Sequence, residues 1–169
     1  MNTLGSTHSA VSHGHGFTHL LERSYERLNA AASSLQAPFL LLVRLYWGWQ
    51  FLLTGWGKLH SLAKVTGFFA NLGIPFPALN APMVSALEFV GGALLAVGLA
   101  SRPVALLLTA DMLVAYATAD REALAAVLRD PGTFYAAAPF TFLFASVLVL
   151  LFGPGALSLD HLLGRLRKR

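Results

Sequence analysis

One stretch of this sequence, residues 37–60 (APFLLLVRLYWGWQFLLTGWGKLH), constrains the fold more than any other. It is apolar and long enough to form a helix across a lipid bilayer, which takes about 20 residues. An arginine, Arg44, nevertheless lies roughly two helical turns inside it. Three more apolar stretches follow along the chain, so we predict transmembrane helices at about 37–57, 79–100, 103–119 and 136–153.

The composition agrees with a membrane environment. Of the 169 residues, 56% are hydrophobic and 12% are charged, whereas roughly a quarter of the residues of a soluble domain are charged. The sequence therefore predicts an all-α integral membrane protein, a four-transmembrane-helix bundle with short amphipathic interfacial helices.

Three regions follow from this pattern. Residues 1–36 lack the continuous apolar segment of a cleavable signal peptide and are expected to form a cytoplasmic tail with an interfacial amphipathic helix. Residues 37–153 form the transmembrane domain. Residues 154–169 form a basic C-terminal tail near anionic headgroups, so the net charge of +4 indicates no nucleic-acid binding.

The basic residues also predict the orientation, because cytoplasmic loops carry the excess of Lys and Arg. With the N-terminus inside, seven of them lie on the cytoplasmic side, namely Arg23, Arg27, Arg102, Arg165, Arg167, Lys168 and Arg169. Four lie on the outer side, namely Lys58, Lys64, Arg121 and Arg129. We therefore expect both termini to be cytoplasmic.

Two connections between the spans have helical patterns. "SLAKVTGFFANLGIPFPALN" predicts a short amphipathic helix that is stopped by Gly73 and the rigid PFP turn. "DREALAAVLRDPG" predicts another, with Asp120 as its N-cap and Pro131 as its terminator. Both would lie on the outer side, where they either cap the bundle or serve only as ordered connectors.

Metal and thiol chemistry find little support in the sequence. The chain has no cysteine, which excludes disulfides, thiolate catalysis and cysteine ligation of iron–sulfur clusters. The histidines of the N-terminal tail, His8, His13, His15 and His19, lie in a Gly/Ser/Thr-rich segment without a fixed scaffold. We therefore predict no metal site, and a redox role would require a bound molecule.

Charged residues inside the predicted spans form the first candidate site. Arg44 and Lys58 share one stripe of the first span with Gly48 and Gly55, and this stripe should face the bundle because exposing cations to lipid is costly. Glu88 of the second span and Asp111 of the third fall at depths similar to that of Arg44. We predict an intramembrane polar cluster of Arg44, Glu88 and Asp111, either as an ion network that fixes helix register or as a polar, proton-linked site.

Aromatic residues near the outer end of the first span form the second candidate site. Trp47, Trp56, Lys58 and His60 could supply the ring walls and donors that a flat quinone would need. The alternative for Trp56 is an aromatic belt at the membrane interface.

Four features occur together in order along the chain: the arginine of the first span, "GxGK" at Gly55, Gly57 and Lys58, "LG-P-P" at Leu72, Gly73, Pro75 and Pro77, and "E-x-x-GG" at Glu88, Gly91 and Gly92. Over about residues 38–153, the chain resembles the DoxX family of small bacterial four-helix membrane proteins. The resemblance implies an inner-membrane protein linked to redox complexes, such as a thiosulfate:quinone oxidoreductase or an assembly with superoxide dismutase and a sulfurtransferase.

Three functions remain in order of preference. The first is an accessory or scaffold subunit that recruits a soluble redox enzyme to the lipid bilayer. The second is a quinone-interacting oxidoreductase subunit, which would need a partner because the chain has no cysteine, no nucleotide motif and no haem-type histidine pair in its spans. The third is a transporter of a small molecule or proton. The sequence does not assign a catalytic residue, and its glycine-rich spans permit packing within one chain or in a homo-oligomer.

Overall fold

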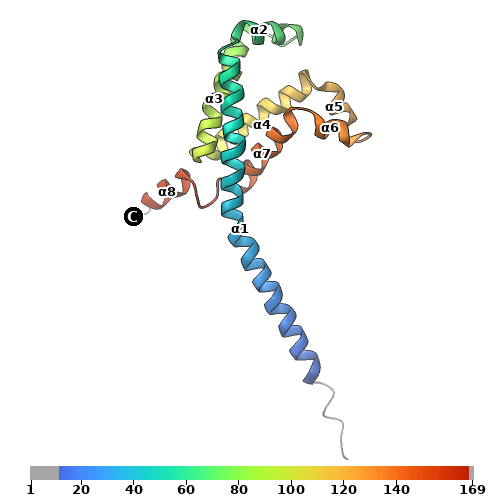
Figure 1. The fold of residues 1–169 in the computed structure, drawn as a ribbon, viewed down its shortest axis with the longest axis vertical. Helices are drawn as coiled ribbons and strands as arrows, with labels where there is room; N and C mark the ends of the chain where they lie inside the picture. Colours follow the sequence, from blue (N-terminus) through green and yellow to red (C-terminus); the bar gives the residue numbers. More distant parts are fainter. Residues whose placement is uncertain (1–11, 168–169) are drawn as a thin grey trace, which may run out of the picture. The chain divides into compact units, whose positions relative to one another are not determined.

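The computed structural model describes residues 12–167, and side chains from residue 21 onward. The described residues form helices without strands (Figure 1). The helices are α1 (Ser12–Leu59), α2 (Leu62–Asn71), α3 (Pro77–Val97), α4 (Ser101–Thr118), α5 (Arg121–Ala126), α6 (Pro131–Ala136), α7 (Pro139–Phe152) and α8 (Leu159–Leu166). The chain divides into two units, residues 1–36 and residues 37–169.

The described part of the first unit is helical, as the amphipathic pattern predicts. It is the N-terminal part of α1, and its apolar side chains from Leu21 to Leu35 are exposed. That this helix lies on the membrane interface stays a prediction. The four tail histidines lie outside the residues whose side chains are described.

The second unit has one apolar core built by four helices. Phe51 of α1, Leu95 of α3, Leu108 of α4 and Val149 of α7 are fully buried there. The helices α4 and α7 pack along each other, and α4 also packs on α3. These four helices correspond to the four apolar stretches of the sequence.

Helices α1 and α3 approach each other closely because glycines face the contact. A Cβ atom on Gly48 would lie 2.7 Å from the backbone N of Ala96 and 2.8 Å from the backbone O of Gly92. A Cβ atom on Gly55 would lie 2.8 Å from the backbone O of Ser85. The prediction that the glycine stripe of the first span faces the bundle is therefore confirmed.

The connection between α1 and α3 also follows the prediction. Helix α2 ends at Asn71, and Gly73 then takes a left-handed conformation with φ +72°. Phe76 is left-handed as well, and Pro77 begins α3, where its fixed φ and missing N–H fit the first helical turn.

The later connections differ in two places from the prediction. The second span, expected at 79–100, ends as a helix at Val97, because Gly98 turns left-handed with φ +74°. Pro131 does not terminate a helix but begins one, α6. Asp130 directly precedes this helix, and its side chain accepts a hydrogen bond from the hydroxyl of Thr133. A proline fits the first turn of a helix, so its position in the sequence is compatible with either role.

The outward surface of this unit is apolar. Leu106 and Leu113 of α4 and Phe144 and Leu151 of α7 are all more than half exposed. By length and composition, two of the described helices can cross a membrane: α1 over Leu21–Leu59, and α3. Helix α7 is apolar but shorter, with 14 residues. Water-soluble monomers rarely expose so much apolar surface.

Candidate functional site

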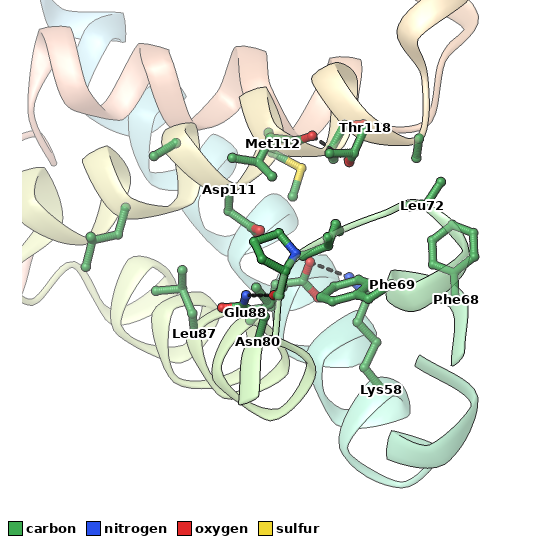
Figure 2. Close-up of a pocket in the computed structure, with 18 residues that line it drawn as sticks. Lys58, Phe68, Phe69, Leu72, Asn80, Leu87, Glu88, Asp111, Met112 and Thr118 are labelled. Atoms are coloured by element: carbon green, nitrogen blue, oxygen red, sulfur yellow. Dashed lines mark hydrogen bonds and ion pairs between the residues drawn. The ribbon is translucent and has the colours of Figure 1, made fainter. Parts of the chain in front are cut away.

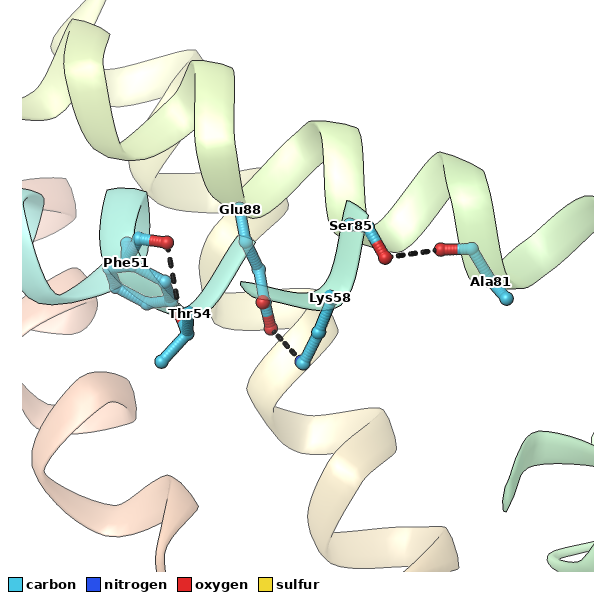
Figure 3. Close-up of polar contacts among 6 residues, drawn as sticks. All are labelled: Phe51, Thr54, Lys58, Ala81, Ser85 and Glu88. Carbon is cyan, nitrogen blue, oxygen red and sulfur yellow. Dashed lines mark hydrogen bonds and ion pairs between the residues drawn. The ribbon is translucent and has the colours of Figure 1, made fainter. Parts of the chain in front are cut away.

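An ion pair joins α1 to α3 in the described part of the chain. Lys58 Nζ lies 2.6 Å from Glu88 Oε1 (Figure 3), and the Glu88 side chain is only 3% exposed, whereas that of Lys58 is 36% exposed. Gly55, one turn before Lys58, allows α3 to approach α1. The close helix contact thus places the two charges within hydrogen-bond distance.

A second carboxyl lies beside this pair. Asp111 projects from α4 and lines the same cavity as Lys58 and Glu88. Figure 2 shows Lys58, Glu88 and Asp111 around one cavity. Three helices therefore each contribute one charged residue to the same site, which we call the Lys58 cluster (Lys58, Glu88 and Asp111).

The cavity beside the Lys58 cluster has a volume of about 520 Å³ and lies between α2, α3 and α4. Its other walls are mostly apolar, and they include Phe68, Phe69, Ile74, Leu87, Leu107 and Met112. Asn80 donates a hydrogen bond of 2.6 Å to the backbone O of Pro75, which fixes the loop before α3 at the cavity.

A smaller cavity of about 290 Å³ also borders the ion pair. Lys58, Glu88 and Phe68 line both cavities, and Asp120 and Ala138 line only the smaller one. Residues from α2 and from the connections around α5 and α6 thus meet at the same end of the unit. This arrangement agrees with the prediction that both connections lie on one side of the bundle.

Arg44 does not belong to this cluster, which corrects the predicted pairing with Glu88. Its side chain is fully buried, and it donates a hydrogen bond to the backbone O of Leu157, next to Gly98. Since Gly48 lies against Gly92 and Ala96, Arg44 lies near the level of Gly98, at the end of α3. Lys58 is fourteen residues farther along α1, or about 21 Å, so each cation reaches a different partner.

The C-terminal segment, predicted to be a basic tail, holds the end of the unit near Arg44. Asp160 of α8 accepts hydrogen bonds of 2.8 Å from the backbone N–H groups of Ala100 and Ser101, at the start of α4. Burial raises the pKa of Asp160, but these N–H groups and the Arg44 guanidinium lower the pKa by more, so it lies below its ordinary value. The sequence analysis missed this contact, whose only local signal is the N-cap Ser158, which accepts a hydrogen bond from the backbone N of His161.

The four residues predicted to hold a quinone do not meet at one site. Trp47 packs against the core, and Trp56 contacts the rings of His60 and Phe89, with centroid distances of 4.1 Å and 5.5 Å. Of the four, Lys58 lines the two cavities at this end of the unit. Trp56 and Lys58 are two residues apart on a helix, about 200° around its axis, so they face opposite sides.

Metal ligation has no counterpart among the residues that the structure describes. Among the side chains described, those of residues 21–167, no group of three or more His, Cys, Asp or Glu could hold a metal ion.

The fold and the site define a class of protein: a helical protein with an apolar outer surface and a partly buried ion pair where three of its helices meet. Residues 39–121 match the DoxX family model, and this match supports the assignment of the chain to the DoxX family, which is membrane-associated. The match runs from α1 to the start of α5 and contains all three residues of the Lys58 cluster, but neither α7 nor α8. No curated protein and no solved structure matches the chain.

Proposed function

We propose that this DoxX protein spans the bacterial inner membrane four times, through α1, α3, α4 and α7, with both termini in the cytoplasm. The exposed apolar side chains of α4 and α7 support this proposal, because they would be stable against lipid. The Lys and Arg distribution supports the orientation. In this arrangement, the Lys58 cluster lies toward the outer side of the membrane and Arg44 toward the cytoplasmic side.

We further propose that the protein is an accessory subunit of a membrane-associated redox complex and binds a quinone-like ligand beside Lys58. The single observation that carries this proposal is the cavity of about 520 Å³ at the Lys58 cluster. Small-molecule sites are typically of this size, with apolar walls and a few convergent polar groups. A quinone ring suits such walls, and Lys58 has N–H groups beyond the one it directs at Glu88 that could meet a ligand carbonyl.

The accessory role follows from the chemistry that the sequence lacks. Without cysteine, the chain cannot hold an iron–sulfur cluster through thiolates or form a redox disulfide. Electrons for a bound quinone would therefore come from a soluble partner enzyme that the protein holds at the membrane.

Filling the cavity tests the ligand site. Ala115 lines both cavities, whereas Ala117, on the same helix, is exposed and lines neither. Each is replaced by phenylalanine, and the proteins are purified in mild detergent from quinone-replete membranes. We expect Ala115→Phe to lose most of the quinone that the wild type and Ala117→Phe retain, as measured by chromatography of the extracted lipids.

Two results would count against the proposal. A wild-type protein that carries no quinone would exclude the ligand, and equal retention by the two variants would exclude the cavity as its site. Mass spectrometry of the same wild-type preparation tests the accessory role, for which we expect a soluble redox enzyme to co-purify. If no soluble enzyme co-purifies in any mild detergent, the accessory role is wrong.

A further inference from the structure

The Lys58 cluster is unbalanced in charge. It has one cation and two carboxyl groups, so it would carry a net charge of −1 if all three were ionised. The other charged groups nearby do not correct this imbalance. Asp120, which lines the smaller cavity, is also acidic, and Lys64 of α2 is exposed and lines neither cavity.

Two oxygen atoms of the cluster are also unpartnered. Glu88 uses Oε1 for Lys58, but its Oε2 is buried without a hydrogen bond from any described residue. Asp111 Oδ2 is buried without a partner in the same way. A buried carboxylate oxygen that accepts no hydrogen bond is costly, and an uncompensated buried charge costs more.

One proton removes both problems. Asp111 and Glu88 line the same cavity, and each has a buried oxygen without a partner, so a proton held between the two carboxyls lets one donate to the other. Carboxyl groups that lie close together often share a single proton, because both cannot ionise easily at short range. The cluster then becomes neutral, with Lys58 balancing the remaining carboxylate.

We infer that Glu88 and Asp111 share one proton at neutral pH, with Lys58 as the counter-ion, and that the cavity is therefore lined by a proton-holding pair. This inference deepens the proposed function, because it rests on that cavity as the ligand site. It also narrows the class of ligand to molecules that exchange a proton at an oxygen atom. A quinol is one example, because its hydroxyl can lose a proton. The carboxylate of the pair would accept a hydrogen bond from that hydroxyl, and Lys58 would donate one to the deprotonated oxygen.

Infrared spectroscopy of the purified protein at neutral pH tests the inference without any ligand, because a protonated carboxylic acid has a carbonyl band that a carboxylate lacks. We expect the wild type to show this band. Asp111→Asn and Glu88→Gln should each abolish it, since the remaining carboxylate then pairs with Lys58. The control variant Glu122→Gln, which removes an exposed carboxyl on α5, should leave the band unchanged.

The pattern of losses decides the outcome. If each single variant retains a band, the two carboxyls hold separate protons and the sharing is wrong. A wild type without the band refutes the inference as well. Should a variant fail to fold, ¹³C labelling of aspartate in the wild type replaces it, and a band whose position does not move with that label would refute a role for Asp111.

A further variant tests Lys58 as the counter-ion. Lys58→Met removes the only cation of the cluster, so the second carboxyl should also become protonated and the band should grow. An unchanged band would mean that Lys58 does not set the charge of the pair. These measurements need no quinone, so they test the shared proton separately from the quinone site. Either hypothesis can be refuted while the other is supported.

Discussion

The close approach of α1 and α3 can be tested with two glycines of the same helix. A Cβ atom on Gly48 would lie 2.7 Å from Ala96 N, 2.8 Å from Gly92 O and 2.9 Å from Ala96 Cβ, whereas ordinary van der Waals contact begins at 3.4 Å. A Cβ atom on Gly57 would meet nothing within 4 Å. Gly48→Ala must therefore push α3 away, and Gly57→Ala is its matched control.

The magnitudes follow from two opposing effects. In a helix, alanine is more favourable than glycine by up to about 1 kcal/mol, and both variants gain this term. Only Gly48→Ala also loses packing, and overpacking of a well-packed core typically costs about 1–3 kcal/mol. We therefore expect Gly48→Ala to be less stable than Gly57→Ala by about 1–3 kcal/mol.

Unfolding in mixed detergent micelles, titrated with SDS, measures this difference. The tryptophans of the chain, Trp47, Trp49 and Trp56, are all on α1 and report the loss of its packing by fluorescence. If Gly48→Ala unfolds at the same SDS fraction as Gly57→Ala, or at a higher one, then α1 and α3 are not in close contact and the described register is wrong.

Three further predictions use the same unfolding assay or a simple reporter. In double-mutant cycles, the losses in unfolding free energy caused by Lys58→Met and Glu88→Leu should couple by about 0.5–3 kcal/mol. The losses caused by Arg44→Met and Glu88→Leu should be additive. If Arg44 couples to Glu88 and Lys58 does not, the pairing predicted from the sequence is right. The pKa of Asp160 is lowered in the folded protein, so its carboxylate stabilises the folded state at pH values above the unfolded pKa of about 3.9. This stabilisation is lost as the pH falls through the lower pKa that Asp160 has in the folded protein. Asp160→Asn should therefore be less stable than the wild type at pH 7, and the gap should close in acid; a gap that widens in acid would contradict the hydrogen bonds to α4. Reporter fusions at residue 169 and within residues 119–135 should report opposite compartments, and the same compartment for both would exclude the four-span topology.

The sequence predicted what depends on local pattern. Apolar runs located the four helices of the core, and glycine and proline located the turn between α2 and α3, because these residues act on the backbone where they stand. The stripe of Gly48, Gly55 and the two cations also faces the bundle as predicted, since helix periodicity alone determines a face.

The pairing of Arg44 could not be predicted from the same pattern. The sequence places Arg44 by its distance from the start of the first span and Glu88 by its distance from the start of the second. In the structure, the contacts of Gly48 with Gly92 and Ala96 instead place Arg44 near the C-terminal end of α3. A shift of a few residues at a helix end moves the register between antiparallel helices by about a turn. The partner that Arg44 does find, the backbone O of Leu157, lies more than a hundred residues away and is a main-chain group, which no sequence pattern marks.

The residues predicted to bind a quinone show a different limit of prediction from sequence. Trp56, Lys58 and His60 are close in sequence, but adjacent positions on a helix point in different directions, and the structure separates Trp56 and His60 from the cavities that Lys58 lines. The cavity itself is formed mainly by residues of α2, α3 and α4, and the family motifs mark only some of them, such as Leu72, Pro75 and Glu88.

The two cations on one stripe of α1 therefore have different roles. Arg44 is fully buried at one end of the unit, where it binds a backbone carbonyl and lies near Asp160, and it lines none of the cavities described above. Lys58 is partly exposed, pairs with Glu88 and lines two cavities. A planar guanidinium with five N–H donors suits the fixed contact, whereas a single ammonium on a flexible stem can turn between a carboxylate and a ligand. The part of the stripe that can take part in binding is thus the lysine of the "GxGK" motif, and Arg44 joins α1 to the C-terminal segment that caps α4.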